Sequence, residues 1–217
     1  MKYYDSYLLI RRDSLADQGF TENEIGWAQF KETLSGMVNT NTEAVIAELV
    51  DNSLDQSARN IEIEIFGRTW EDLSIVVYDD GHGFRNYENM QKSFDLAVFK
   101  EREEDEIGRN NIGLKLSPLS RCNYVHAHSI GESNERLFRG LHDEDLDGGW
   151  GSSDVSRPQI TRLKNHINQK LSVDGMKTAV AMSEFHKRPE IGEVDDSSKK
   201  NYAKHIAQYL GIIYQKK

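Results

Sequence analysis

The order of helices and strands expected from the sequence predicts an α+β protein, in which a mixed or antiparallel sheet lies under a layer of helices. A stripe of apolar residues at helical spacing predicts a helix at residues 42–57, with Thr42 as its N-cap. Strict alternation predicts a half-buried strand at residues 61–65, and a more apolar strand follows at residues 73–78. Because strands follow one another without intervening helices, a doubly wound parallel sheet is disfavoured.

The rest of the chain adds further elements to this plan. Strands are expected at residues 123–130, 135–141, 159–163 and 177–185. Helices are expected at residues 22–34, 87–98, 112–120 and 198–215, and a short turn or helix is expected at residues 165–171. We expect an N-terminal extension or strap at residues 1–40, one domain at residues 41–190, and a C-terminal segment at residues 191–217 that contains the last helix.

Composition narrows the class of protein. The chain has 217 residues and a single cysteine, Cys122, so no disulfide forms within it and a cytoplasmic location is expected. No apolar run approaches the roughly 20 residues that span a bilayer, and the N-terminus lacks a secretory pattern, so no membrane partner is expected. The net charge of −9 disfavours non-specific binding of nucleic acid by this domain alone. DNA contacts are therefore expected only through a local basic patch or other domains.

Three polar side chains share one strip of the helix expected at residues 42–57. Glu48, Asn52 and Asp55 lie about one turn apart, at the edge of the apolar stripe. A solvated helix face is the common explanation of such a strip. A carboxylate one turn before an amide also suits metal-assisted hydrolysis, since Asn offers a neutral oxygen to Mg²⁺. Glu can accept a proton from an attacking water, an effect worth about 10²–10⁴-fold in rate.

The segment Asp-Asp-Gly-His-Gly at residues 79–83 ends the strand expected at residues 73–78. A tight hairpin would account for it, because Asp-Gly is a favoured turn pair. In the functional interpretation, the carboxylate of Asp79 accepts a hydrogen bond from an exocyclic amine. Gly81 and Gly83 then let a flat base lie close to the backbone, where a Cβ would collide.

Two later pieces gain meaning only beside these motifs. The loop at residues 108–115, Gly-Arg-Asn-Asn-Ile-Gly-Leu-Lys, runs into an expected helix and presents backbone N–H groups to a phosphate. Lys115 would add a positive charge there. Thr178 follows Gly175-Met-Lys and is, taken alone, an ordinary strand residue.

In this order, the pieces resemble the GHKL ATPase superfamily, which includes DNA gyrase B subunits, ninety-kilodalton heat-shock chaperones, histidine-kinase catalytic domains, MutL mismatch-repair proteins and MORC proteins. The resemblance covers residues 42–185, and the loop that ends Ile-Gly-Leu-Lys looks closest to MORC-like and MutL-like proteins. It implies the Bergerat fold, a two-layer α/β sandwich. In that fold a mixed, mostly antiparallel sheet carries helices on one face, and ATP lies between the helices and a lid, here residues 84–112.

The resemblance also implies a role for each matching residue. Glu48 is the general base, and Asn52 is the ligand of Mg²⁺. Asp79 binds the amino group of adenine, and Thr178 supports it through water. The other nucleotide contacts fall on the glycine-bearing segments, at Gly81, Gly83, Gly108, Ile112, Gly113, Leu114 and Lys115.

The function implied is Mg²⁺-dependent binding and hydrolysis of ATP, coupled to a conformational or dimerisation switch in a protein of DNA repair, restriction or defence. An ATP-dependent homodimer is expected in the full-length protein, as is a transducer domain whose lysine touches the γ-phosphate. Asn111 and Lys177 stand where many members have Gly, which leaves open a nucleotide-sensing module without useful turnover. A histidine-kinase-type catalytic domain is a further alternative, although Glu48 disfavours it, and the match to the chaperones is looser.

Other reactive side chains have simpler interpretations. His126 and His128 alternate on a strand, a geometry that can bind metal, but two histidines that face one side of a sheet are the favoured interpretation. His82 is expected to face solvent in the turn. Cys122 lies near the two strand histidines, and a role as nucleophile is disfavoured.

Overall fold

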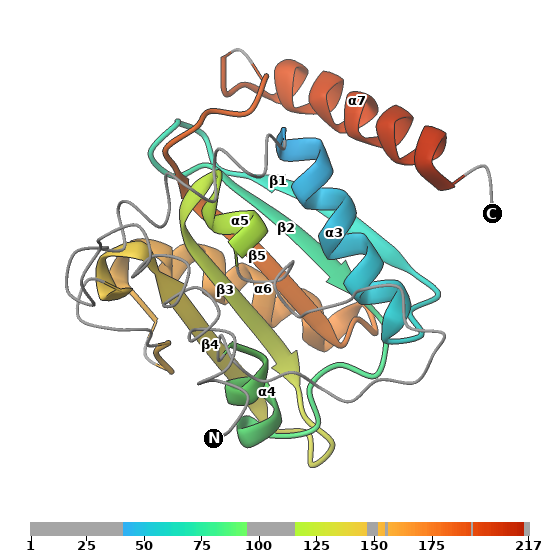
Figure 1. Cartoon of the computed structure of the whole chain (residues 1–217), viewed down its shortest axis with the longest axis vertical. Helices are drawn as coiled ribbons and strands as arrows, with labels where there is room; N and C mark the ends of the chain where they lie inside the picture. The colour runs from blue at the N-terminus through green and yellow to red at the C-terminus, as the bar shows by residue number, and fades with distance from the viewer. Residues whose placement is uncertain (1–40, 95–115, 147–151, 155, 192, 215–217) are drawn as a thin grey trace, which may run out of the picture.

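A five-stranded sheet organises the residues that the computed structural model describes, which are 41–94, 116–146, 152–154, 156–191 and 193–214 (Figure 1). The strand order is β1-β2-β5-β3-β4, and all four pairings are antiparallel. The strands are β1 (Ile61–Phe66), β2 (Ser74–Asp79), β3 (Cys122–Ile130), β4 (Arg136–His142) and β5 (Thr178–Phe185). The predicted α+β class is confirmed, while the expected parallel component of the sheet is absent from the described strands. Short connections join β1 to β2 and β3 to β4, and such connections permit only antiparallel pairing.

In the described part of the chain, one face of the sheet carries four helices. These are α3 (Thr42–Asp55), α4 (Tyr87–Phe94), α5 (Leu116–Leu119) and α7 (Asp196–Tyr214). They cover the larger hydrophobic core, to which α3 contributes the predicted apolar stripe and α7 contributes Tyr202 and Ile206. Asn41, not Thr42, caps α3, because its Oδ1 accepts a hydrogen bond of 2.9 Å from the backbone N–H of Ala44.

The opposite face is covered by α6 (Thr161–Val173), which corrects the expectation that all helices lie on one face. Leu163, Ile167 and Leu171 of α6 pack on Val76 and Tyr78 of β2 and on alanines of β5. The prediction of a strand at residues 159–163 is also wrong. These residues form a short 3₁₀ turn (Pro158–Ile160) and the start of α6, and the four-residue spacing of the apolar positions continues as a helix.

Alternation along β1 serves both faces. Ile61, Ile63 and Ile65 pack against the larger core. Glu62 and Glu64 face α6, where Lys170 forms an ion pair with Glu62 and the Nε2 of His166 lies 2.9 Å from Glu64 Oε1. Glu62 is exposed and the other residues of β1 are half-buried, as predicted, and α6 lies beside the polar face of the strand.

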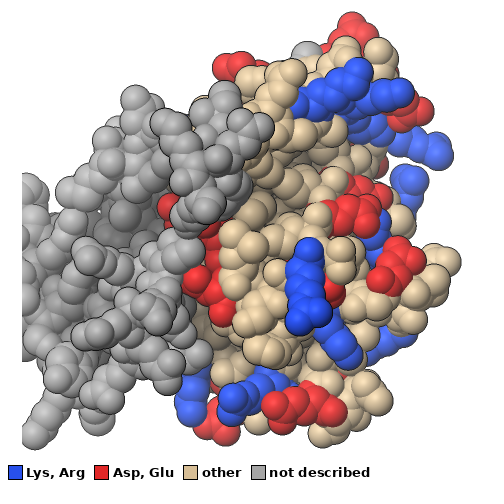
Figure 2. Space-filling view, turned by 90° about the vertical axis from the view of Figure 1, so that its right-hand side faces the viewer, with Lys and Arg blue, Asp and Glu red and all other residues tan. Residues whose placement is uncertain are grey.

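The outer surface on the side of α7 and β1 carries both signs of charge. Figure 2 shows Lys and Arg side chains interspersed with Asp and Glu on this face. Lys199 of α7 donates a hydrogen bond of 3.0 Å to the carbonyl of Gly67 and lies 3.1 Å from Asp196, so its charge is used within the protein. Among the described helices, none is both long enough and apolar enough to cross a bilayer.

Candidate functional site

Three strands bring polar side chains together at one end of the sheet. Asp79 ends β2, Thr178 begins β5, and Ser129 is the penultimate residue of β3. The register pairs Asp79 with Thr178 and Thr178 with Ser129, so these residues form a row across three strands, here called the polar row. The row faces α3, because the residues two positions along each strand belong to the core beneath α3: Val77, Ala127 and Val180.

Asp79 is held in a buried position. Its side chain is 4 % exposed. Its Oδ2 accepts a hydrogen bond of 3.2 Å from the hydroxyl of Ser53 on α3, and its Oδ1 accepts one of 3.0 Å from the backbone N–H of Gly81. Burial raises the pKa of Asp79 to about 6, although these two hydrogen bonds act in the opposite direction. At neutral pH the carboxylate is therefore an acceptor that has lost much of its hydration.

The turn that follows β2, residues 80–83, lies against α3 and β5 and is here called the glycine turn. Its position on α3 is fixed by the backbone N–H of His82, which donates a hydrogen bond of 2.9 Å to the carbonyl of Gln56. A Cβ on Gly81 would stand 2.7 Å from that carbonyl, and a Cβ on Gly83 would stand 2.8 Å from Thr178 Oγ1. Gly83 also has a φ of +66°, which disfavours any side chain. Both positions therefore require glycine for close approach of the backbone. His82 itself is exposed, as predicted.

Glu48 and Asn52 lie one helical turn apart on α3, as the sequence predicted. Glu48 is exposed, whereas Asn52 is partly buried. Partial desolvation, followed by the negative charge of Asp51, raises the pKa of Glu48, which is the direction that suits a general base. The Nδ2 of Asn52 is buried and has no hydrogen-bond partner among the described residues. A buried amide without a partner is costly unless a ligand or water completes it.

Thr178 and Ser129 complete the floor of the site. Both are buried, at 5 % and 1 % exposure. Their hydroxyl oxygens lie 3.3 Å apart, and Ser129 also accepts a hydrogen bond of 3.3 Å from the backbone N–H of Phe84, which follows the glycine turn. The glycine turn is thus attached to the ends of β3 and β5.

Some predicted site residues lie outside the described residues. They are Gly108, Ile112, Gly113, Leu114 and Lys115, together with residues 95–112 of the expected lid. The extension at residues 1–40 and the helix expected at residues 22–34 are also outside the described part of the chain.

Sequence reasoning missed Ser53 and Ser129. Ser53 lies on the apolar, buried stripe of α3 and donates to the carboxylate of Asp79. A hydroxyl on an otherwise apolar, buried stripe needs a polar partner, and this was the available signal. Ser129 carried no such signal, because its contact with Thr178 joins residues 49 positions apart and depends on the strand register.

The strand histidines have a structural role on the opposite face. His126 and His128 are buried, and the Nδ1 of His126 lies 3.0 Å from the Nε2 of His128. Burial lowers the pKa of His126 to about 3 and that of His128 well below its ordinary value, so both are neutral. No group of three or more metal-ligating side chains forms among the described residues. The two histidines are hydrogen-bonded to each other, as the favoured interpretation allowed.

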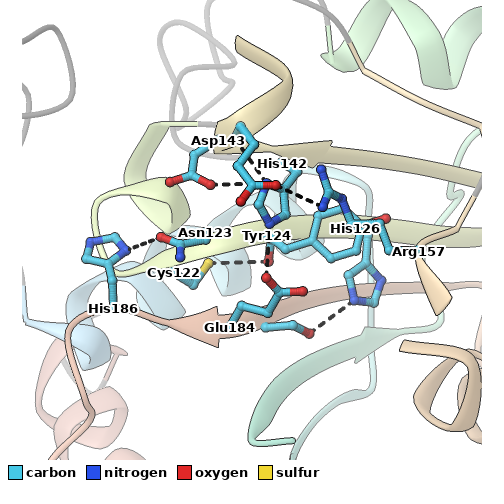
Figure 3. A network of polar contacts seen from close by, with 11 residues as sticks. Cys122, Asn123, Tyr124, His126, His142, Asp143, Arg157, Glu184 and His186 are labelled. Carbon is cyan, nitrogen blue, oxygen red and sulfur yellow. Dashed lines mark hydrogen bonds and ion pairs between the residues drawn. The ribbon is translucent and has the colours of Figure 1, made fainter. Parts of the chain in front are cut away.

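A second polar network surrounds His142 near the other end of β3 (Figure 3). The Nε2 of His142 lies 3.0 Å from Glu184, and its Nδ1 lies 3.1 Å from Asp143. Cys122 is fully buried nearby, and its thiol contacts the carbonyl of Pro118 at 3.2 Å. A thiol that solvent does not reach is a poor nucleophile. This network lies apart from the polar row, at the end of β3 opposite Ser129.

The chemistry of the polar row and the glycine turn suits one class of ligand. The carboxylate of Asp79 and the hydroxyl oxygen of Thr178 are hydrogen-bond acceptors at this end of the sheet, and the absence of side chains at Gly81 and Gly83 lets the turn pack closely beside them. The amide of Asn52 and the carboxylate of Glu48 project from the neighbouring helix. The residues present fit a flat heterocycle with an exocyclic amine. Helix α3 supplies oxygen atoms of the kind that a hard cation such as Mg²⁺ prefers as ligands.

Comparison with known proteins identifies proteins that are similar to this chain. A family profile described as "Histidine kinase-, DNA gyrase B-, and HSP90-like ATPase" matches residues 40–170, which is more than half of the chain. The chain is 28 % identical over 113 residues to a DNA mismatch repair protein MutL of Microcystis aeruginosa. Among solved structures, it is similar to the ATPase and transducer domains of a DNA topoisomerase II from Balamuthia mandrillaris, with 18 % identity and a TM-score of 0.41.

The matches cover only part of each relative. The aligned region is 52 % of this chain and 18 % of the MutL protein. For the topoisomerase, it is 70 % of this chain and 38 % of the solved chain.

Proposed function

Because the chain belongs to the family of histidine kinase-, DNA gyrase B- and HSP90-like ATPases, we propose that it binds ATP together with Mg²⁺ and hydrolyses it. The observation that carries this proposal is the buried carboxylate of Asp79 beside the glycine turn. Its hydrogen bonds to Ser53 and Gly81 fix both oxygens, and the turn packs closely beside it because Gly81 and Gly83 carry no side chain. The same surface is bordered by Glu48 and Asn52 on α3.

In the proposed complex, Asp79 accepts a hydrogen bond from the amino group of adenine, and Thr178 supports this contact through water. Gly81 and Gly83 let the base approach the backbone. The phosphates are assigned to the loop at residues 107–115, where the backbone and Lys115 would hold them, and residues 84–112 are assigned to the lid.

The proposed reaction is attack of water on the γ-phosphate. Glu48 accepts the proton of that water, and its raised pKa brings it closer to the pH at which proton transfer is efficient. Asn52 offers its amide oxygen to the cation, while its buried Nδ2, which has no partner among the described residues, is available to a phosphate oxygen or a water. Mg²⁺, when bound, would neutralise the charge of the phosphates.

We further propose that nucleotide binding acts as a switch. ATP would favour dimerisation or docking of a neighbouring domain, and hydrolysis would reverse it. The MutL relative is named for DNA mismatch repair, which makes a DNA-related task the favoured setting. Contacts with DNA would then be made by other domains, since this chain has a net charge of −9.

Binding is tested by calorimetric titration of the chain with a non-hydrolysable ATP analogue, with and without Mg²⁺. We expect Mg²⁺-dependent binding in the wild type and none in Asp79→Asn, which cannot present two acceptor oxygens. Asp80→Asn is the matched control, because Asp80 binds the backbone of Arg59 and Asn60 instead, at 2.7 and 2.8 Å. Equal affinity in wild type and Asp79→Asn would reject the assigned site.

Turnover needs a separate measurement of phosphate release. Glu48→Gln should retain binding of ATP and lose at least about 100-fold in hydrolysis, the lower range for a general base. Glu71→Gln, an exposed carboxyl in the β1–β2 connection, should hydrolyse ATP at the wild-type rate. Full hydrolysis by Glu48→Gln removes the general-base assignment. Binding without turnover, also in a longer protein that includes a transducer domain, favours the nucleotide-sensing module instead.

A further inference from the structure

A serine with no role in the proposed nucleotide contacts lies at the floor of the site. Ser129 is 1 % exposed and stands opposite Thr178 in the β3–β5 register. Its hydroxyl donates to the carbonyl of Lys177 at 3.0 Å and accepts from the backbone N–H of Phe84 at 3.3 Å. The third contact is with Thr178 Oγ1, also at 3.3 Å. Ser129 therefore has three partners at a position where solvent supplies none.

The number of protons decides the direction of the third contact. A serine hydroxyl carries one proton and two lone pairs. The carbonyl of Lys177 can only accept, so it takes the proton of Ser129, and the N–H of Phe84 can only donate. The remaining lone pair of Ser129 faces Thr178, so the shared hydrogen bond takes the proton of Thr178. Thr178 Oγ1 is left with lone pairs alone for any other neighbour.

The glycine turn prevents an easy change of this arrangement. A Cβ at Gly83 would stand 2.8 Å from Thr178 Oγ1 and 2.9 Å from Ser129 Oγ, so the turn lies directly over the hydroxyl pair. Phe84 follows in the chain and supplies the N–H that holds Ser129. The backbone therefore holds Ser129 in the orientation in which it accepts the hydrogen bond that Thr178 donates.

We infer that Ser129 is a positioning residue that sets base selectivity: by binding the proton of Thr178, it makes the polar row a set of acceptors that favours a 6-aminopurine over a 6-oxopurine. This inference rests on the proposed nucleotide site. Thr178 and the carboxylate of Asp79 face each other across β2 and β5, and both accept. An amino group at C6 of the purine, or a water donating from that side, satisfies them. A carbonyl oxygen at C6 brings a third acceptor to the same place, and a buried acceptor without a donor is strongly disfavoured.

The test compares two nucleotides that differ only in the C6 substituent and the N1 proton of the base. Dissociation constants are measured by calorimetry for the non-hydrolysable analogues of ATP and of inosine triphosphate. Wild type should prefer the adenine nucleotide. Ser129→Ala frees the proton of Thr178 to point at a C6 carbonyl, so the preference should fall about threefold to tenfold, mainly through tighter binding of the inosine nucleotide.

Ser183→Ala is the matched control. Ser183 is equally buried, at 2 % exposure, but it lies on the opposite face of β5, where its hydroxyl is 2.8 Å from that of Ser74. Loss of this hydroxyl should affect stability without changing the ratio of the two dissociation constants. Ser129→Cys, which keeps the shape with a weak donor and acceptor, replaces Ser129→Ala if the alanine variant does not fold, and its preference should also fall.

A double-mutant cycle with Thr178→Val separates positioning from a general effect on the fold. In the Thr178→Val background, Ser129→Ala should leave the nucleotide preference unchanged, because the effect passes through the hydroxyl of Thr178. The inference is overturned if Ser129→Ala keeps the wild-type preference, or if it changes the preference equally in both backgrounds. If the folded wild type binds neither nucleotide, the proposed nucleotide site itself fails, and that outcome is distinct from binding with an unchanged preference.

Discussion

At the scale of single residues, the burial of Asp79 links the proposed function to stability. Burial raises the pKa of this carboxyl from 3.8 to about 6. The native state then holds the proton more tightly than the unfolded state, so the stability contributed by protonated Asp79 is present below pH 3.8 and is lost as the pH rises to about 6. The shift corresponds to about 3 kcal/mol at neutral pH, since one pKa unit is worth about 1.4 kcal/mol.

We predict that Asp79→Asn stabilises the nucleotide-free chain by about 1–3 kcal/mol at pH 7.5, although it abolishes nucleotide binding. An asparagine keeps an oxygen for the N–H of Gly81, and its amide can donate to Ser53, whose own proton can then be donated to the carbonyl of Leu49 at 3.1 Å. Urea denaturation at several pH values measures the effect. The gap between the two proteins should open between about pH 4 and pH 6 and stay constant above it, in line with the linkage relation.

The control for this prediction is Asp79→Ala, which leaves the N–H of Gly81 without its side-chain acceptor. That variant should be less stable than Asp79→Asn at every pH, because a buried donor without a partner costs about 1–3 kcal/mol. A gap between wild type and Asp79→Asn that does not change with pH would contradict the assigned ionisation of Asp79.

The residues that the sequence identified share one property. Glu48, Asn52, Asp79 and the two glycines lie within short motifs, where spacing along the chain carries the information. Structure places these two motifs beside each other through the hydrogen bonds of Asp79 to Ser53 and of His82 to Gln56. Ser129 belongs to no motif and is defined only by cross-strand register. A single sequence therefore predicts the local parts of the candidate site but not the residues that support them from other strands.

At the scale of elements, substitutions of glycine can separate backbone strain from a collision between an added Cβ and the site. Gly83 and Gly175 both have positive φ, at +66° and +73°. A Cβ at Gly83 would stand 2.8 Å from Thr178 Oγ1, whereas a Cβ at Gly175 would meet nothing within 4 Å. Alanine at Gly175 therefore introduces backbone strain alone, of about 1 kcal/mol, while alanine at Gly83 adds a collision within the site.

We predict that Gly83→Ala weakens binding of the ATP analogue by at least about tenfold and that Gly175→Ala changes it by less than about twofold, since tenfold corresponds to about 1.4 kcal/mol. Calorimetric titration gives both affinities, and urea denaturation gives the stabilities. Both variants should lose stability through backbone strain. Equal affinities in the two variants would show that the space beside Thr178 is not part of the nucleotide site.

The secondary structure that the sequence predicted well has strong local periodicity. β1 and β2 alternate or run apolar over their whole length, and α3 carries a continuous stripe, so the period itself identified them. The error at residues 159–163 has a physical cause. Ile160 and Leu163 begin a stripe that continues with Ile167 and Leu171. When only five residues are considered at a time, this helical pattern looks like a strand followed by a turn.

At the scale of the whole molecule, the position of α6 was beyond sequence reasoning. An apolar stripe shows that a helix is covered on one side, but it does not show which face of the sheet covers it. Strand β2 contacts helices on both of its faces, because all six of its residues are buried. Ile75 and Val77 belong to the core beneath α3, and Val76 and Tyr78 belong to the core beneath α6.

Because β2 contributes residues to both cores, we predict that the two cores unfold together. Ile206→Ala on α7 and Ile167→Ala on α6 remove side chains that are 2 % and 0 % exposed, one from each core. Each should lower the free energy of unfolding by about 2–5 kcal/mol in a single transition, because β2 cannot lose one layer and keep the other.

The ATP analogue at 100 times its dissociation constant should then raise the free energy of unfolding by about 2.7 kcal/mol in both variants, although only one core underlies the proposed nucleotide site.

Urea denaturation followed by both circular dichroism and tryptophan fluorescence measures this coupling, since two probes of one cooperative unit give coincident curves. If Ile167→Ala instead unfolds in two steps, with an early loss of helix that the ATP analogue does not delay, then α6 is an independent layer. In that case, nucleotide binding at the polar row stabilises only the α3 side of the sheet. Coincident curves, shifted equally by the analogue, would mean that occupancy of the site is felt on both faces of the sheet through the strands that they share.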